Sequence, residues 1–134
     1  MVEILVDTSI WVDFFKEGKT REAQLLDELL EHNLVCTTNL IKAEIVGGAK
    51  SQKEFDLLRN YFNALPCLPE YPAIWEDITK YRFKLKRKGF NASIPDLMIA
   101  ALAIFHNKPI FTVDKHFFLM RKELPLLRLI EERR

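Results

Sequence analysis

The chain has 134 residues, of which 49% are hydrophobic, 29% are charged and only 4 are glycine. This composition excludes a disordered chain and a collagen-like repeat. Lysine and arginine together number 20 and the acidic residues 19, so a net charge of +1 excludes a general polyanion-binding protein. The length predicts one domain over residues 1–134.

Apolar runs and helical periodicities alternate through the first half of the chain. The run Ile4-Leu5-Val6 is apolar on both faces, which is typical of a buried parallel strand. Thr20 is expected to cap the helix that follows it. Helices are expected over residues 8–15, 20–32, 39–49 and 52–65, and strands over 34–37 and 67–68.

The second half continues the alternation. A long helix is expected to end before Gly89, and Ser93 is expected to open the next one. Helices are predicted over residues 74–88, 93–106 and 115–122, a strand over 109–113 and an edge strand over 126–130. Strands that alternate with helices predict an α/β fold, a parallel sheet flanked by helices in three α/β/α layers.

The cysteines and the apolar segments bear on the cellular compartment. Cys36 and Cys67 have neither zinc-site nor redox-pair spacing, so we expect buried free thiols. The chain does not begin with a signal-peptide pattern. Its longest strongly apolar segment, 97–105, is shorter than the ~20 residues of a membrane span. We therefore expect a cytoplasmic protein without membrane contacts.

Four acidic residues lie where strands end or helices begin. Asp7 follows the first predicted strand and Asp114 follows the fourth. Asp96 lies in the first turn of the helix opened by Ser93, and Glu44 lies in the helix after the second strand. Because active sites of open α/β sheets lie beyond the carboxyl ends of the strands, we expect these four acids to reach one site.

Two interpretations of these acids stay open at this point. Asp7, Asp96 and Asp114 each suit a helix cap, and Ser93 with Asp96 has capping-box spacing. Glu44 is not explained in this way, because it lies in an apolar helical segment where a carboxylate is costly unless it has a cation or hydrogen bonds. A metal site explains all four, and carboxylates without histidine or cysteine select Mg²⁺ or Mn²⁺.

The acidic motifs resemble a known family. Asp7-Thr8-Ser9 resembles the opening motif of PIN-domain ribonucleases, and Glu44 lies inside a helix as in that family. Ile94-Pro95-Asp96 and Thr112-Val113-Asp114 resemble its later motifs, in the same order and over essentially the whole chain. The short, stand-alone form looks most like the VapC toxins of prokaryotic toxin–antitoxin pairs.

The resemblance implies a metal-dependent endoribonuclease with a PIN-like fold. It implies catalytic and metal-binding roles for Asp7, Glu44, Asp96 and Asp114, and hydrogen-bonding roles beside them for Ser9 and Thr112. It also implies Mg²⁺ or Mn²⁺ as cofactor, an RNA substrate, a small VapB-like antitoxin and a homodimer. Many members carry a further acid after the position of Asp114, where this chain has Lys115, His116 and Phe117.

Three other functions are weighed against the toxin. A PIN nuclease of RNA maturation has the same chemistry and no antitoxin. A receiver domain also has acids at strand ends, but it needs paired acids where this chain has Asp7-Thr8. A non-catalytic interaction module is expected to have lost an acid, and all four are present here.

Residues 80–90 combine basic and aromatic side chains. The segment contains six basic residues and no acid, with Tyr81, Phe83 and Phe90 between them. This pattern is typical of an RNA-backbone patch with stacking rings, and also of a solvated helix end whose cations complement the helix dipole. The RNA-binding candidates are Lys84, Lys86, Arg87 and Lys88.

Overall fold

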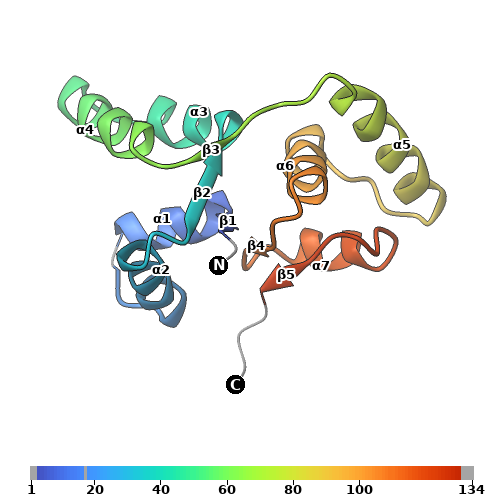
Figure 1. Ribbon diagram of the computed structural model, residues 1–134, viewed down its shortest axis with the longest axis horizontal. Helices are drawn as coiled ribbons and strands as arrows, with labels where there is room; N and C mark the ends of the chain where they lie inside the picture. The colour runs from blue at the N-terminus through green and yellow to red at the C-terminus, as the bar shows by residue number, and fades with distance from the viewer. Residues whose placement is uncertain (1–2, 17, 131–134) are drawn as a thin grey trace.

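The fold is built on a parallel sheet whose strands are buried near its centre (Figure 1). The computed structural model describes residues 3–16 and 18–130. In this part of the chain a 5-stranded sheet has the order β3-β2-β1-β4-β5, with every neighbouring pair parallel. The strands are β1 (Ile4–Val6), β2 (Val35–Thr38), β3 (Cys67–Leu68), β4 (Ile110–Phe111) and β5 (Leu129–Ile130).

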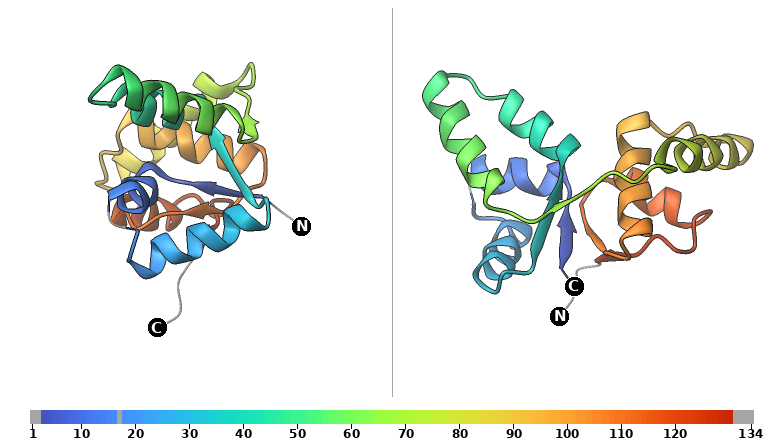
Figure 2. Two further views of the ribbon diagram at one scale, coloured as in Figure 1. Left: turned by 90° about the vertical axis from the view of Figure 1, so that its left-hand side faces the viewer. Right: turned by 45° about the horizontal axis from the view of Figure 1, so that its top comes forward.

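Helices cover both faces of the sheet, as the predicted three-layer α/β/α fold requires. The helices α1–α4 gather on one side and α5–α7 on the other in Figure 1 and in the right-hand view of Figure 2. Among α5–α7, α6 lies between the sheet and α5 (Figure 1). The helices are α1 (Thr8–Lys16), α2 (Arg21–Glu31), α3 (Asn39–Gly47), α4 (Gln52–Asn63), α5 (Ile74–Arg87), α6 (Ile94–Phe105) and α7 (Lys115–Arg121).

Short polar side chains begin most of these helices by capping their free backbone N–H groups. Thr20 accepts from the backbone N–H of Ala23, and Ser93 accepts from that of Asp96, as predicted. Thr38 ends β2 and caps α3 directly, so this strand and helix meet without a loop. The sheet–helix turns are therefore tight, and they hold the carboxyl ends of the strands close to the helix starts.

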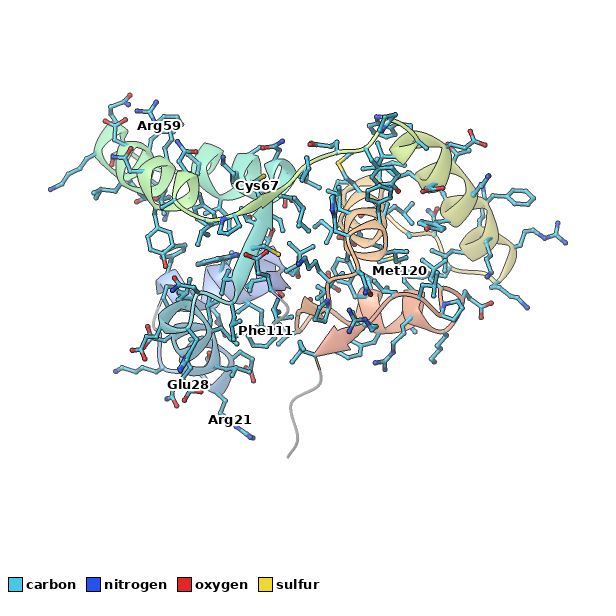
Figure 3. The ribbon with its side chains drawn as sticks, in the orientation of Figure 1. Arg21, Glu28, Arg59, Cys67, Phe111 and Met120 are labelled. Atoms are coloured by element: carbon cyan, nitrogen blue, oxygen red, sulfur yellow. The ribbon has the colours of Figure 1, made fainter. Side chains whose placement is uncertain are left out.

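Apolar side chains on both sides of the sheet form the core. Leu5 of the central strand pairs with Cys36 and Ile110, and all three are fully buried. Trp11 packs edge-on against Phe62 of α4, with ring centroids 4.8 Å apart. Phe111 of β4 and Met120 of α7 are buried, and Figure 3 shows where their side chains lie. Burial of both strand faces explains why the strand sequences are continuously apolar.

Most sequence-predicted elements are confirmed, and the differences are local. The strand predicted over 109–113 is only Ile110–Phe111, because the Thr112 hydroxyl accepts a hydrogen bond from the backbone N–H of Asp114 and begins a turn. The edge strand begins at Leu129 instead of residue 126, after a turn at Leu124. Both cysteines are free as predicted, but Cys67 is only half-buried because β3 is an edge strand.

The helices of the described residues are also short compared with a bilayer. Within residues 3–16 and 18–130, no helix combines the length and the apolar character needed to cross a membrane.

Candidate functional site

The predicted site lies at the carboxyl edge of the sheet, beside the central strands. Asp7 follows β1 directly, and Asp114 comes three residues after Phe111, the last residue of β4. Asp96 lies in the first turn of α6. Because β1 and β4 are parallel neighbours, their ends bring Asp7 and Asp114 to the same edge, where α6 also begins.

Asp7 is a buried carboxylate held by two hydroxyl groups. It is 5% exposed, and its Oδ2 accepts hydrogen bonds from Ser9 Oγ at 2.9 Å and Thr112 Oγ1 at 2.8 Å. A buried carboxylate is costly unless donors satisfy it, so these hydroxyls fix its orientation. Ser9 and Thr112 are thus placed against Asp7, the geometry that their predicted roles require.

Asp114 begins α7 and is linked to Asp7 through Thr112. Its Oδ1 accepts from the backbone N–H of His116 at 2.9 Å, and its own N–H donates to Thr112 Oγ1 at 2.9 Å. The predicted capping role is therefore present. The capping hydrogen bond leaves the Asp114 carboxylate free to accept further bonds, because its two oxygens offer about four acceptor positions.

Asp96, Asp114 and His116 form a compact group of metal-ligating side chains. One ligand atom from each lies within 4.8 Å of the others. Burial raises the pKa of Asp96, and the negative charges of Asp114 and Asp7 raise it further. A hydrogen bond with Ser93 and the nearby His116 oppose this rise. The cluster is an anionic, partly desolvated position that a cation would stabilise.

The donor set fits a hard or borderline divalent cation. Two carboxylates and one imidazole suit Mg²⁺ less well than an all-oxygen set and suit Mn²⁺ better, because nitrogen ligands favour later transition metals. The sequence-predicted metal set left out His116, which lies at position two of α7 with its Nδ1 3.1 Å from Asp114 Oδ1. The sequence signal that could have indicated His116 as a ligand is its position two residues after Asp114 at the start of a helix.

Glu44 is placed differently from the other three acids. It is exposed, and its Oε1 accepts a hydrogen bond from Thr8 Oγ1 at 2.9 Å. The carboxylate therefore has a hydrogen bond and contact with solvent, so its place in an apolar helical segment does not by itself require a cation. Thr8 adjoins Asp7, so Glu44 lies toward the rim of the site. Among the described residues, Glu44 does not belong to the metal-ligating group of Asp96, Asp114 and His116.

The basic candidates lie at the end of α5 and just after it. Lys84, Lys86, Arg87 and Lys88 are all exposed. The loop after them leads to α6, and the Phe90 ring lies 5.9 Å from the His116 ring. The basic segment is therefore connected to the acidic cluster through one short loop and an aromatic contact.

The substitution Thr112→Val is expected to destabilise the site through lost hydrogen bonds, because it replaces the hydroxyl by a methyl group at nearly the same side-chain volume. It removes one donor to Asp7, which keeps its hydrogen bonds from Ser9, and it removes the acceptor of the Asp114 N–H. We expect a loss of about 1–3 kcal/mol in the free energy of unfolding and a loss of about 10- to 100-fold in Mn²⁺ affinity. Urea denaturation and calorimetric titration measure the two effects.

Thr112→Ser is the matched control, because it keeps the hydroxyl group. It should retain the Mn²⁺ affinity, whereas equal affinities in the valine variant and the wild type would contradict the positioning role of Thr112.

Acidic side chains gathered at the carboxyl ends of parallel strands define an α/β protein with a candidate divalent-cation site. A model of the PIN domain family matches residues 4–123. This chain belongs to the PIN domain family.

Relatives of known name align over most of the chain. Ribonuclease VapC1 of Methanocaldococcus jannaschii is 32% identical over 128 residues, covering 92% of this chain and 85% of the relative. Ribonuclease VapC11 of Mycobacterium tuberculosis is 31% identical over 118 residues, covering 85% of this chain and 88% of the relative.

Solved structures show the same fold. VapBC2 from Rickettsia felis, bound to a promoter DNA fragment, has a TM-score of 0.75 and 22% identity, covering 97% of this chain and 98% of that one. A toxin–antitoxin complex from Klebsiella pneumoniae has a TM-score of 0.72 and 21% identity, covering 96% and 97%. The receiver-domain alternative is overturned by the family match.

Proposed function

We propose that this chain is a metal-dependent endoribonuclease that acts as the VapC-type toxin of a toxin–antitoxin pair. The observation that carries the proposal is the convergence of Asp96, Asp114 and His116 beside the buried Asp7, in a PIN-domain chain. The ribonuclease names of relatives that align over most of this chain support the activity.

The side chains of the site have separate roles in this proposal. Asp96, Asp114 and His116 would hold a divalent cation, with Asp7 beside them. When bound, the cation supplies charge for the phosphate oxygens and lowers the pKa of a water molecule. Thr112 and Ser9 keep the Asp7 carboxylate oriented through their hydroxyl groups. Glu44, exposed at the rim, accepts from Thr8 and is proposed to complete the acidic set.

The histidines favour attack by water over attack by the RNA 2′-hydroxyl. The ring of His32 hydrogen-bonds the carbonyl of Glu28, and that of His106 hydrogen-bonds the carbonyl of Pro69, each at 2.8 Å. In the part of the chain that the structure describes, neither ring belongs to the metal-ligating group, in which His116 is the single histidine beside Asp96 and Asp114. A histidine pair for acid–base transfer at the 2′-hydroxyl is therefore not assembled at the acids. Hydrolysis by water leaves a 5′-phosphate and a 3′-hydroxyl.

A single 2′-deoxy nucleotide at the cleavage site is expected to leave cleavage in Mn²⁺ or Mg²⁺ intact. In the proposed mechanism the 2′-hydroxyl that this change removes is not the nucleophile, and its role is limited to recognition. The measurement is gel analysis of cleavage with mass spectrometry of the product ends. Cyclic phosphate ends, or a substrate that still binds and is no longer cut, would contradict the water mechanism.

A groove beside Glu44 supports a protein partner. It has a volume of about 640 Å³ and opens between α1, α3 and α4 next to Glu44. Its apolar lining includes Val12, Phe15, Ile45 and Leu58. We propose that a VapB-like antitoxin places an apolar segment here and that the toxin forms a homodimer. The RNA-maturation alternative has no antitoxin, so co-purification with the product of the adjacent gene distinguishes the two.

A further inference from the structure

The outer face of α5 exposes large aromatic side chains beside a groove. Trp75 is 57% exposed, Phe83 is 65% exposed and Ile94, at the start of α6, is 42% exposed. These residues line a groove of about 410 Å³ together with Ile78, Thr79, Arg82 and Lys86. Exposed aromatic rings of this size, gathered on one helix face, indicate an interaction surface.

The cations of α5 divide between two edges of the helix. Arg82 and Lys86 line the groove with Trp75 and Phe83, whereas Lys80 and Lys84 line a different groove with Leu126. The sequence-based set of candidates included Lys84 and left out Arg82, because spacing along the chain does not show which edge a side chain occupies.

The aromatic groove is electrostatically suited to a polyanion. The chain carries no acid from Ile78 to Pro95. The nearest acids on the helix are engaged elsewhere: Glu76 lies 4.0 Å from Lys80, and Asp77 accepts from the Tyr71 hydroxyl at 2.7 Å. The Arg87 guanidinium lies 5.7 Å from the centre of the Phe83 ring, which adds a third cation beside that ring.

The groove also leads toward the acidic cluster. Ile94 lines it and precedes Asp96 by two residues in the first turn of α6. The Phe90 ring, in the loop between α5 and α6, lies 5.9 Å from the ring of His116. One end of the groove therefore lies close in the chain to Asp96 and to the loop that contacts His116.

We propose that the face of Trp75, Arg82, Phe83 and Lys86, here called the α5 face, binds single-stranded RNA beside the cleavage site. Bases stack on the two rings and phosphates contact the two cations, the combination typical of single-strand binding. Unpaired bases are required, because the bases of a duplex are already stacked on one another. This inference rests on the proposed function and names how its substrate is held.

A second copy of the chain suits the α5 face less well. A two-fold interface places the same patch of each copy against the other. Both copies of the patch would carry Arg82 and Lys86, with no acid between Ile78 and Pro95 to offset these charges. Like charges brought together oppose association.

The first test measures binding of a short, unstructured RNA in the presence of EDTA, so that binding is separated from cleavage. Arg82→Gln with Lys86→Gln should weaken binding and lower the salt slope, log Kd against log salt, by about 1.4, because each single-strand phosphate contact contributes about 0.7. Lys19→Gln with Lys53→Gln removes two exposed charges outside α5 and should leave the slope unchanged. Trp75→Ala with Phe83→Ala should weaken binding by at least about 30-fold, because each stacked base contributes a factor of about 5 or more.

Tryptophan fluorescence gives an independent readout. Trp11 is fully buried and Trp75 is 57% exposed, so RNA that stacks on the α5 face should quench Trp75 selectively. Trp75→Phe keeps a stacking ring and should abolish the quenching while retaining most of the affinity. Unchanged melting curves establish that each variant is folded, as expected for exposed positions.

The outcomes separate this inference from the proposed function. Equal salt slopes for Arg82→Gln with Lys86→Gln and for its control variant, or no quenching of Trp75, would overturn the inference. The same holds if Trp75→Ala with Phe83→Ala converts a dimer to a monomer in sedimentation and leaves RNA affinity unchanged, because the face is then a contact between copies. Quenching and a lowered slope in a protein that never cleaves RNA would support the α5 face and contradict the nuclease activity.

Discussion

Replacement of Asp96 by asparagine is expected to slow RNA cleavage by at least about 100-fold, the order of effect found when one charge-stabilising group is removed from a reaction site. The change keeps the size of the side chain and removes one of the two negative charges that converge with His116. Initial rates on a labelled RNA in excess Mn²⁺, with product ends identified as above, measure the effect.

An acid outside the site supplies the control for Asp96→Asn. Asp27 is exposed on α2, on the opposite side of the sheet from α6 and α7, so Asp27→Asn makes the same chemical change without altering the cluster (Figure 1). Its cleavage rate should equal that of the wild type. A rate for Asp96→Asn within about tenfold of the wild type would contradict a role of this carboxylate in transition-state stabilisation.

Mn²⁺ is expected to raise the thermal stability of the wild type and to leave that of Asp96→Asn nearly unchanged. A ligand present at about 100 times its Kd adds roughly 2.7 kcal/mol to the free energy of unfolding. For a domain of this size that corresponds to a rise of roughly 10 °C in Tm. Melting curves with Mn²⁺, with Mg²⁺ and with EDTA measure the shift, and coinciding curves for the wild type would contradict a preformed site.

The same variant should be more stable than the wild type when metal is absent. Burial and the charges of Asp114 and Asp7 raise the pKa of Asp96 in the folded protein. A raised pKa means that folding is favoured while the group is protonated, and this contribution is lost as the pH rises through the folded pKa. At neutral pH, Asp96→Asn removes the penalty, so its Tm in EDTA should exceed that of the wild type. A lower Tm would favour a purely structural role.

The sequence predicted the order and type of the elements well, because local chemistry determines them. Ile4–Val6 is apolar on both faces as buried parallel strands are, and Thr20 and Ser93 satisfy N–H groups only a few residues away. Strand lengths were predicted less well. The turn after Phe111 depends on a hydrogen bond between Thr112 and Asp114, which periodicity does not reveal.

The candidate site divides in the same way. The order of the motifs around Asp7, Glu44, Asp96 and Asp114 pointed to one family, and the family match over residues 4–123 confirms that resemblance. The sequence alone did not show that Asp96 and Asp114 converge with His116 while Glu44 remains exposed. These relations depend on how parallel strands and helices from distant parts of the chain are placed together.

By itself, the sequence determined an α/β chain of the PIN family with acids at the ends of its elements, because these properties lie in short segments of neighbouring residues. Only the tertiary structure decided that Thr112 joins Asp7 to Asp114, and that Arg82 and Lys86 lie on a different edge of α5 from Lys80 and Lys84. Hydrogen bonds between strands and the exposure of a helix edge depend on packing against residues far away in sequence. The chemistry of the site therefore follows from local residue types, whereas the geometry of the site and the division of the α5 cations follow from the fold.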